Sequence, residues 1–273
     1  MIDRISAAAS NLADWHDASL IALGRPTRRT GALWTCEAGP GVIYLMAIPL
    51  GSRDEGHLQS EEMDAFVGRR SGDPLVVADT WDSLKLGERG FSPSPYGAVN
   101  DWYWRPPAAI AGDESLPTPG LVIERVRDAA GLKEFEDVSA RGFGSEKLLE
   151  SVGSFGIHAP GVLEDPRMHV FVGRVDGAAV TAAMAYVSGD VVGVYGVATA
   201  PEHRRKGFGE AITRAAAAAE PELPSWLQPS DMAAPMYRRI GYEPIGHYTS
   251  WLRPASTPAQ DRDSPLSRRY PAP

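Results

Sequence analysis

The stretch Val-Tyr-Gly-Val-Ala-Thr-Ala-Pro-Glu-His-Arg-Arg-Lys-Gly-Phe-Gly, residues 194–209, carries the most informative pattern in this sequence of 273 residues. Its first half is rich in β-branched and small apolar residues, as in a buried strand, until Pro201 ends the run. An apolar pattern of helical period then starts at Gly207 and Gly209. The stretch therefore predicts a strand, a tight basic turn and the beginning of a helix.

A helix that begins in this way predicts an anion site. The first backbone N–H groups of a helix have no intrahelical partner and lie at the positive end of its dipole, where a pyrophosphate fits. The two glycines remove Cβ atoms where phosphate oxygens must approach closely. Arg204, Arg205 and Lys206 add positive charge beside them. The competing interpretation is a solvated basic turn in front of a surface helix.

Other phosphate and metal motifs do not fit this sequence. The Rossmann pattern G-x-G-x-x-G is incomplete because Ile212 occupies the place of the third glycine. The Walker pattern G-x-x-x-x-G-K-S/T and the zinc pattern H-E-x-x-H do not occur, and the six histidines are scattered. We therefore expect no metal site.

Strand and helix patterns continue on both sides of the stretch, and two of the turns are strong hairpin signals, Asp176-Gly177 and residues 188–190. Residues 141–166 are glycine-rich and show no period. The expected strands are 121–125, 169–175, 178–187, 191–198, 225–228 and 246–252, and the expected helices are 129–140, 207–219 and 231–240.

The segment 194–209 resembles the acetyl-CoA motif of the GNAT superfamily of N-acetyltransferases, in which Arg or Gln is followed by x, x, Gly, x and Gly or Ala. Arg204, Gly207 and Gly209 fill that pattern. The resemblance covers about 121–254 and implies an α+β fold with a mixed sheet, with acetyl-CoA as the co-substrate. The cofactor-binding residues that it implies, mainly through backbone groups, are Val197, Ala198, Thr199, Arg204, Arg205, Lys206, Gly207, Phe208 and Gly209.

The same resemblance implies a catalytic tyrosine. Tyr237, four residues before Gly241, occupies the place where family members carry a tyrosine that protonates the departing CoA thiolate. A phenol with a pKa near 10 can donate to a developing thiolate. Ser230 matches a position that often contacts CoA, where asparagine is more common. The alternative for Tyr237 is packing against the sheet.

The sequence does not identify the general base. Family members often carry a glutamate on the strand before the loop, but Tyr195 is the only titratable side chain in that strand here. Four residues of the irregular segment could reach the site, although a solvated surface position is the favoured interpretation for each: Glu146, Glu150, His158 and Glu164. Two functions therefore stay open, an N-acetyltransferase acting on a primary amine and a non-catalytic acyl-CoA-binding or sensing module.

The N-terminal half contains an internal repeat of the C-terminal half. Residues 74–91 and the strand of 100–107 follow the same order as residues 224–242 and 248–254, each ending in a Trp-containing strand and Arg-Pro. This predicts a degenerate GNAT-like α/β domain at 1–112, a linker at 111–120, the GNAT domain at 121–254 and a disordered tail at 255–273.

The first copy lacks the features of a cofactor site. Leu86 occupies the place of Tyr237, and the basic string 69–74 has Pro74 where the second glycine is needed. We therefore expect this half to bind no CoA and to wall the acceptor cleft with Trp34, Trp102 or Trp104, unless these tryptophans simply pack in the core.

Composition limits the partners. The net charge of −8 argues against a nucleic-acid-coating role, and the longest apolar run, residues 42–50, is too short to cross a membrane. The N-terminus makes a poor signal peptide, and Cys36, the only cysteine, fits a reducing cytoplasm as a half-buried strand residue. We expect a cytoplasmic protein with a small-molecule or peptide amine as acceptor. Polyamines, aminoglycosides, amino acids and protein N-termini all stay open, as does the oligomeric state.

Overall fold

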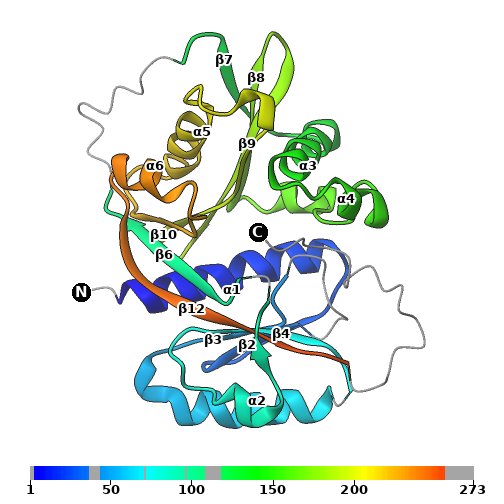
Figure 1. Ribbon diagram of the computed structural model, residues 1–273, viewed down its shortest axis with the longest axis vertical. Coiled ribbons are helices and arrows are strands. Elements are labelled where there is room, and N and C mark those ends of the chain that lie inside the picture. The colour runs from blue at the N-terminus through cyan, green and yellow to red at the C-terminus, as the bar shows by residue number, and fades with distance from the viewer. Residues whose placement is uncertain (1–2, 37–43, 71, 96, 108–117, 256–273) are drawn as a thin grey trace. The chain divides into compact units, whose positions relative to one another are not determined.

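The computed structural model describes residues 3–36, 44–70, 72–95, 97–107 and 118–255 (Figure 1). The chain divides into two compact units that are interleaved in sequence. Unit 1 consists of Met1–Gly24 and Asp101–Gly246, and unit 2 of Arg25–Asn100 and His247–Pro273. The predicted linker at 111–120 and the predicted tail at 255–273 lie almost entirely outside the described residues.

Unit 1 is built on a mixed sheet with the strand order β6-β11-β10-β9-β8-β7. Four strands form an antiparallel meander, β10 and β11 are parallel, and β11 and β6 are antiparallel. The strands are β6 (Val99–Arg105), β7 (Leu121–Arg125), β8 (Met168–Val175), β9 (Ala178–Ser188), β10 (Val191–Thr199) and β11 (Ser225–Leu227). The α+β fold class predicted from the sequence is confirmed.

Helices cover both faces of this sheet (Figure 1). On one face lie α3 (Ala129–Phe143) and α4 (Glu146–Val152), and on the other lie α5 (Phe208–Ala217) and α6 (Ala234–Arg239). Helix α3 begins where the Asp128 carboxylate accepts a hydrogen bond from the Gly131 N–H at 2.9 Å and ends at Gly144, whose φ is +66°. Its apolar stripe, which includes Leu132, Phe135 and Val138, is buried.

The N-terminal helix α1 (Arg4–Ala22) also belongs to unit 1 and packs against β9 and β10. Three fully buried alanines, Ala8, Ala9 and Ala13, allow the helix backbone to approach the sheet closely. Asn11 provides the polar link, because its amide is buried and makes hydrogen bonds to β9, β10 and β11. The sequence pattern of this helix does not indicate which half of the chain it completes.

Unit 2 has the strand order β1-β2-β3-β4-β12, with β3 and β4 parallel and the Ala47 Cα opposite that of Val77. Its core contains the buried side chains of Phe66, Leu75 and Leu86. The elements are β1 (Thr27–Arg29), β2 (Leu33–Cys36), β3 (Ala47–Pro49), η1 (Arg53–Glu55), α2 (Gly56–Arg69), β4 (Leu75–Asp79), η2 (Leu86–Arg89), β5 (Ser92–Pro93) and β12 (Glu243–Arg253). Cys36 is buried in β2, as expected.

The element order supports the internal repeat. In unit 1, β11 and α6 lead to Gly241 with φ +92°, and in unit 2, β4 and η2 lead to Gly90 with φ +79°. The strand that follows each of these segments in the chain, however, pairs with a strand of the other copy. Strand β6, which follows η2 in the chain, pairs with β11, whereas β12, which follows α6, pairs with β4. The compact units therefore do not coincide with the predicted boundaries at 1–112 and 121–254.

Three local predictions differ from the structure. Residues 141–166 are not irregular throughout, because they contain α4 and the 3₁₀ helix η3 (Pro160–Glu164). Such short helices show too few turns for a period to emerge. Helix α5 ends at Ala217 instead of residue 219, and α6 begins three residues later than expected, at Ala234.

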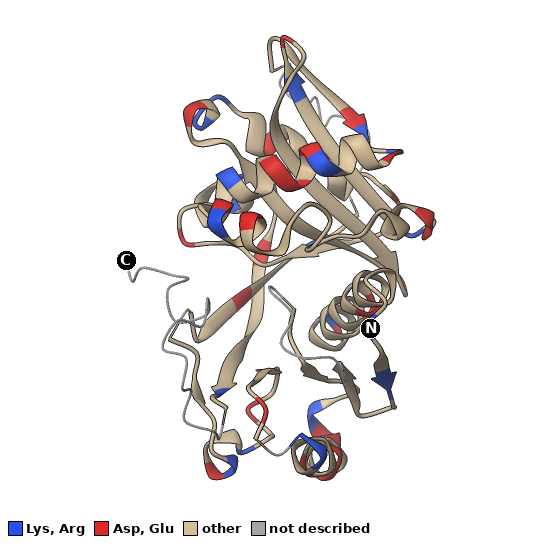
Figure 2. Cartoon of the chain, turned by 90° about the vertical axis from the view of Figure 1, so that its right-hand side faces the viewer, with Lys and Arg blue, Asp and Glu red and all other residues tan. Residues whose placement is uncertain are grey.

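The surface of the described residues carries mixed charge. In the view of Figure 2, Lys and Arg alternate with Asp and Glu along the helices and turns instead of gathering on one face. No helix in the described part of the chain combines the length and apolar character needed to span a bilayer. Within the same residues, no group of three or more His, Cys, Asp and Glu side chains is arranged to hold a metal ion.

Candidate functional site

Strand β10 separates from β11 over its last residues, while its pairing with β9 resumes at Ala198 and Thr199. It pairs with β11 only at residues 192–194, and its register with β9 shifts between Tyr195 and Ala198. Gly196 has φ +59° at this irregularity, which creates a bulge. Gly196 and Val197 have no Cα partner in the register with β9 or in that with β11. The backbone at 196–199 therefore lies where an extended ligand can pair with it as an added strand.

The loop after β10 has the backbone geometry of an anion cradle. It passes through the 3₁₀ turn η4 (Pro201–His203), and both Arg205 (φ +61°) and Gly207 (φ +83°) adopt left-handed conformations before α5 begins. At Gly207 a Cβ atom would have no neighbour closer than 3.8 Å, so conformation and not space requires glycine there. At Gly209 an added Cβ would lie 3.4 Å from the Thr199 hydroxyl, an ordinary contact.

Arg204 has a different role from the one expected of a phosphate-binding side chain. Its Nη2 donates to the Gly142 carbonyl at 2.6 Å and its Nε donates to the Thr199 carbonyl at 3.3 Å. The guanidinium thereby joins the end of α3 to the end of β10. We infer that Arg204 braces the loop and that its charge acts on an anion only from this braced position.

Arg205 and Lys206 are exposed at the same turn. Phe208, in contrast, is buried and stacks on the His203 ring at 6.2 Å between centroids, so its side chain anchors the helix start and only its N–H faces the loop. The loop thus combines helix N–H groups, two exposed cations and the positive end of α5. This arrangement can hold a pyrophosphate.

Tyr237 of α6 is buried in a core cluster with residues of α5 and β10, and 4% of its surface is exposed. Thr213 is its hydrogen-bonding neighbour, and the Thr213 hydroxyl itself donates to the Gly209 carbonyl at 2.7 Å. Burial raises the pKa of Tyr237 above that of a free phenol. The side chain therefore stays protonated at neutral pH, as an acid must before it donates.

Ser230 is exposed and follows β11. Its carbonyl accepts hydrogen bonds from the Ala233 and Ala234 N–H groups, both at 2.9 Å, which shape the turn into α6.

An aromatic cluster surrounds the bulge on the face that α1 and α3 cover. The Phe135 ring lies 3.3 Å from the position of an added Gly196 Cβ, and Trp15 stacks on Tyr195 at 4.5 Å between centroids. The His158 ring packs edge-on against both Phe135 and Trp15, with ring centroids 5.5 Å and 6.3 Å apart. Sequence reasoning missed Trp15, because nothing local connects residue 15 with residue 195.

Of the four candidate bases, only His158 is buried near the bulge, whereas Glu146, Glu150 and Glu164 are exposed. Burial lowers the pKa of His158 to about 4, so the ring is neutral at pH 7. The Glu136 carboxylate, which the sequence did not single out, holds the backbone of residues 155–158. Glu136 of α3 is buried and accepts hydrogen bonds from the backbone N–H groups of Phe155 (2.8 Å) and His158 (2.9 Å).

The equivalent helix start in unit 2 differs from the predicted one. The segment that follows a strand with a parallel neighbour and enters a helix is 50–56, before α2, and not the string 69–74. There the Glu55 carboxylate accepts the Ser52 N–H at 2.6 Å, and an added Cβ at Gly51 would overlap it. The site is filled by the chain's own anion, which agrees with a copy that binds no phosphate.

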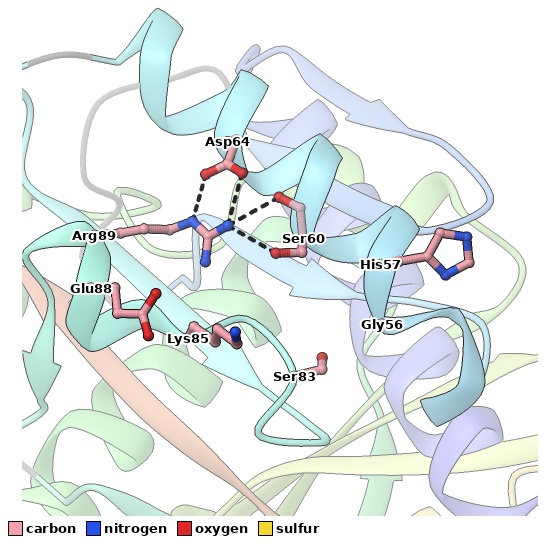
Figure 3. Close-up of a pocket in the computed structure, with 8 residues that line it drawn as sticks. All are labelled: Gly56, His57, Ser60, Asp64, Ser83, Lys85, Glu88 and Arg89. Carbon is pink, nitrogen blue, oxygen red and sulfur yellow. Dashed lines mark hydrogen bonds and ion pairs between the residues drawn. The ribbon is translucent and has the colours of Figure 1, made fainter.

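Unit 2 also contains a cavity of about 570 Å³ between α2 and η2 (Figure 3). Eight residues line it: Gly56, His57, Ser60, Asp64, Ser83, Lys85, Glu88 and Arg89.

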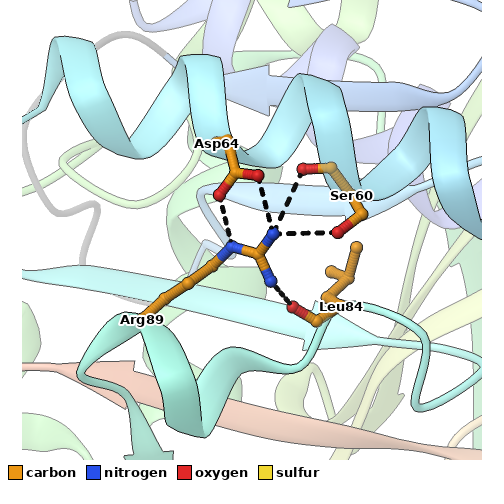
Figure 4. A network of polar contacts seen from close by, with 4 residues as sticks. All are labelled: Ser60, Asp64, Leu84 and Arg89. Carbon is orange, nitrogen blue, oxygen red and sulfur yellow. Dashed lines mark hydrogen bonds and ion pairs between the residues drawn. The ribbon is translucent and has the colours of Figure 1, made fainter.

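The Arg89 guanidinium in this cavity is held by an ion pair and hydrogen bonds within unit 2 (Figure 4). Arg89 donates to both oxygens of Asp64, at 2.6 and 2.8 Å, to the Ser60 hydroxyl at 2.8 Å and to the Leu84 carbonyl. The hydrogen bond from Arg89 holds the pKa of Asp64 below its usual range. This network joins η2 to α2, and we assign it a structural role.

The predicted cleft tryptophans are also structural. Trp34 and Trp102 are fully buried and Trp104 is 4% exposed, so each packs in the core of its own unit. Trp102 packs edge-to-face on Trp226 of β11.

Comparison with known proteins agrees with this site. The model of the acetyltransferase (GNAT) domain family matches residues 166–244, which contain β8 to α6 and the whole loop. None of the curated proteins matches the sequence.

Solved structures match over most of the chain. A GCN5-related N-acetyltransferase from Kribbella flavida is 21% identical, with a TM-score of 0.59 over 90% of this chain and 96% of that one. A conserved protein of unknown function from Staphylococcus epidermidis is 16% identical, with a TM-score of 0.54 over 84% of this chain and 93% of that one. At these identities the likeness establishes the fold. The GNAT family model matches residues 166–244, which is the part of the chain that contains β10, the basic loop and α5.

Proposed function

We propose that this protein is an N-acetyltransferase that moves an acetyl group from acetyl-CoA to a primary amine. The observation that carries the proposal is the separation of β10 from β11 at 195–199, directly before the basic loop and the N-terminus of α5. Backbone groups of Val197 and Thr199 would pair with the pantetheine arm, and the N–H groups of 205–209 would hold the pyrophosphate.

The chemistry follows from this placement. The amine nitrogen attacks the thioester carbon, the carbonyl electrons move to oxygen, and the nitrogen loses a proton to solvent, from which Tyr237 regains its own proton at the end of the cycle. The oxyanion is stabilised by the N–H of Val197 and then collapses, which breaks the carbon–sulfur bond. The phenol of Tyr237 gives its proton to the CoA thiolate. The products are the amide and CoA.

The exposed cations of the loop provide the test of cofactor binding. Because Arg204 also braces the fold, the double substitution Arg205→Glu/Lys206→Glu is the cleaner variant. Calorimetric titration should show micromolar binding of acetyl-CoA and CoA to the wild type. The variant should bind at least about tenfold more weakly, since one hydrogen bond to a charged group contributes about 1.5–3 kcal/mol.

The matched control is Arg28→Glu/Lys85→Glu, which reverses one exposed arginine and one exposed lysine of unit 2 and should leave binding unchanged. No binding to the wild type at millimolar cofactor would reject the proposal. Micromolar binding would justify a screen of polyamines, aminoglycosides, amino acids and peptide N-termini for thiol release.

A non-catalytic acyl-CoA-binding module is the second candidate. The observation in its favour is that Tyr195, the only titratable side chain of β10, donates its hydroxyl to the Asn11 side chain at 2.6 Å and cannot serve as a base. The Tyr237→Phe variant distinguishes the two functions. If Tyr237 is the acid, kcat falls by about 10²–10⁴ while CoA affinity is kept. Unchanged turnover would remove Tyr237 from the mechanism, and no turnover by the wild type on any amine would favour the binding module.

A further inference from the structure

Helix α3 follows the bulge of β10 closely along two of its turns. Near its middle, the Phe135 ring contacts the Gly196 position at 3.3 Å. Near its end, an added Cβ at Gly142 would lie 2.7 Å from the Ala198 Cβ and 3.2 Å from the Thr199 N atom. The hydrogen bond from Arg204 to the Gly142 carbonyl fixes that end. The helix and the strand therefore run side by side in the same direction from 196 to 199.

Ser139 lies between these two contacts. Residues 135, 139 and 142 fall within roughly 60° on a helix of 3.6 residues per turn, so the three share one face. At a rise of about 1.5 Å per helical residue and about 3.3 Å per strand residue, Ser139 is level with the Val197–Ala198 peptide. This is the part of β10 that has no registered partner before Ala198.

The Ser139 hydroxyl is buried and has no hydrogen-bond partner within the described residues. A serine inside a helix usually donates to the carbonyl four residues earlier, and this hydroxyl does not. A buried polar group without a partner costs about 1–3 kcal/mol. Native proteins rarely leave such groups unsatisfied, so this hydroxyl is available to a bound molecule that reaches it.

We propose that the Ser139 hydroxyl donates a hydrogen bond to the thioester carbonyl of bound acyl-CoA. The inference rests on the proposed function, because the pantetheine arm must lie along 196–199 for its thioester to come level with Ser139. Ser139 then positions the carbonyl next to the Val197 N–H, with the Phe135 ring closing the same face. CoA without an acyl group offers no such acceptor, so the contact also favours acyl-CoA over the product.

The Ser139→Ala variant tests the proposal without a fold defect, because alanine is smaller and a better helix former. Calorimetry with CoA and with acetyl-CoA separates the cofactor from its acyl group. The variant should keep its affinity for CoA within twofold and lose about two- to tenfold for acetyl-CoA, as expected for one neutral hydrogen bond. Ser139→Thr, which keeps the hydroxyl, should retain the preference of the wild type.

Isotope-edited infrared spectroscopy of bound [1-¹³C]acetyl-CoA reads the hydrogen bond directly. The thioester carbonyl band should shift to higher frequency in Ser139→Ala and not in Ser151→Ala, the matched serine of the neighbouring helix α4. An unchanged band and unchanged acetyl-CoA affinity in Ser139→Ala would overturn the proposal.

Equal weakening of CoA and acetyl-CoA with an unchanged band would assign Ser139 to the pantetheine arm and also overturn it. Failure of the wild type to bind CoA at all is a different outcome, because it rejects the proposed function together with this inference.

Discussion

Asn11 offers the sharpest test of the finding that helix α1 is part of unit 1. Its Nδ2 donates to the Tyr186 carbonyl at 3.1 Å and to the Ser188 hydroxyl at 2.9 Å. Its Oδ1 accepts from the Tyr195 hydroxyl at 2.6 Å and from the Trp226 indole N–H at 3.0 Å. The amide is 1% exposed, so all four hydrogen bonds are made without water.

The Asn11→Ala substitution leaves two buried donors without an acceptor, those of Tyr195 and Trp226. Each such group costs about 1–3 kcal/mol, so we expect the free energy of unfolding of unit 1 to fall by about 2–6 kcal/mol in total. Urea unfolding followed by tryptophan fluorescence measures this change, since Trp15 and Trp226 both lie beside the network. Asn100→Ala, at the chain's other asparagine, is the control and should change stability by less than about 0.5 kcal/mol.

A double-mutant cycle identifies the hydrogen bond as the cause. Tyr195→Phe removes one of the two orphaned donors, so in the Asn11→Ala background it should restore about 1 kcal/mol. If the two substitutions add within about 0.3 kcal/mol, or if Asn11→Ala is as mild as the Asn100 control, the reasoning about this network is refuted.

Two further predictions concern the face that α3 covers. Gly142→Ala should destabilise unit 1 by about 1–3 kcal/mol and weaken CoA binding, because the new methyl group would overlap Ala198. The control is Gly161→Ala, whose Cβ would lie 3.6 Å from its nearest neighbour and which should change neither property. Equal effects of the two substitutions in urea unfolding and in calorimetric titration with CoA would contradict this prediction. Burial lowers the pKa of His158 from 6.5 to about 4, so its contribution to stability is complete above pH 6.5 and is lost as the pH falls toward 4. Between pH 7.5 and pH 5 the wild type should therefore lose about 2 kcal/mol of unfolding free energy, and His158→Gln should lack this loss. Urea unfolding at several pH values measures the difference. If the unfolding free energies of the two proteins change with pH in the same way, the ring is not buried in its neutral form.

Much of the local structure was predictable because its determinants are local. The alternation of apolar residues and the hairpin signals at Asp176-Gly177 and 188–190 predicted the meander, and β8, β9 and β10 form within one or two residues of the expected bounds. The glycine at 207 was read as a residue needed at the helix start, and its φ of +83° supplies the reason. A turn and a helix start are determined by a few neighbouring residues, which a sequence displays directly.

The sequence by itself thus determined the order of elements, the mixed sheet and the position of the basic loop after β10. Only the tertiary structure decided which elements belong together. The pairing of β6 with β11 and of β12 with β4 depends on contacts between residues far apart in the chain, as does the place of α1. The roles of Arg204 as a brace and of Ser139 as a buried hydroxyl facing the bulge also come from packing. Side-chain pattern reports which face of an element is buried, but it carries no information about which distant segment covers that face.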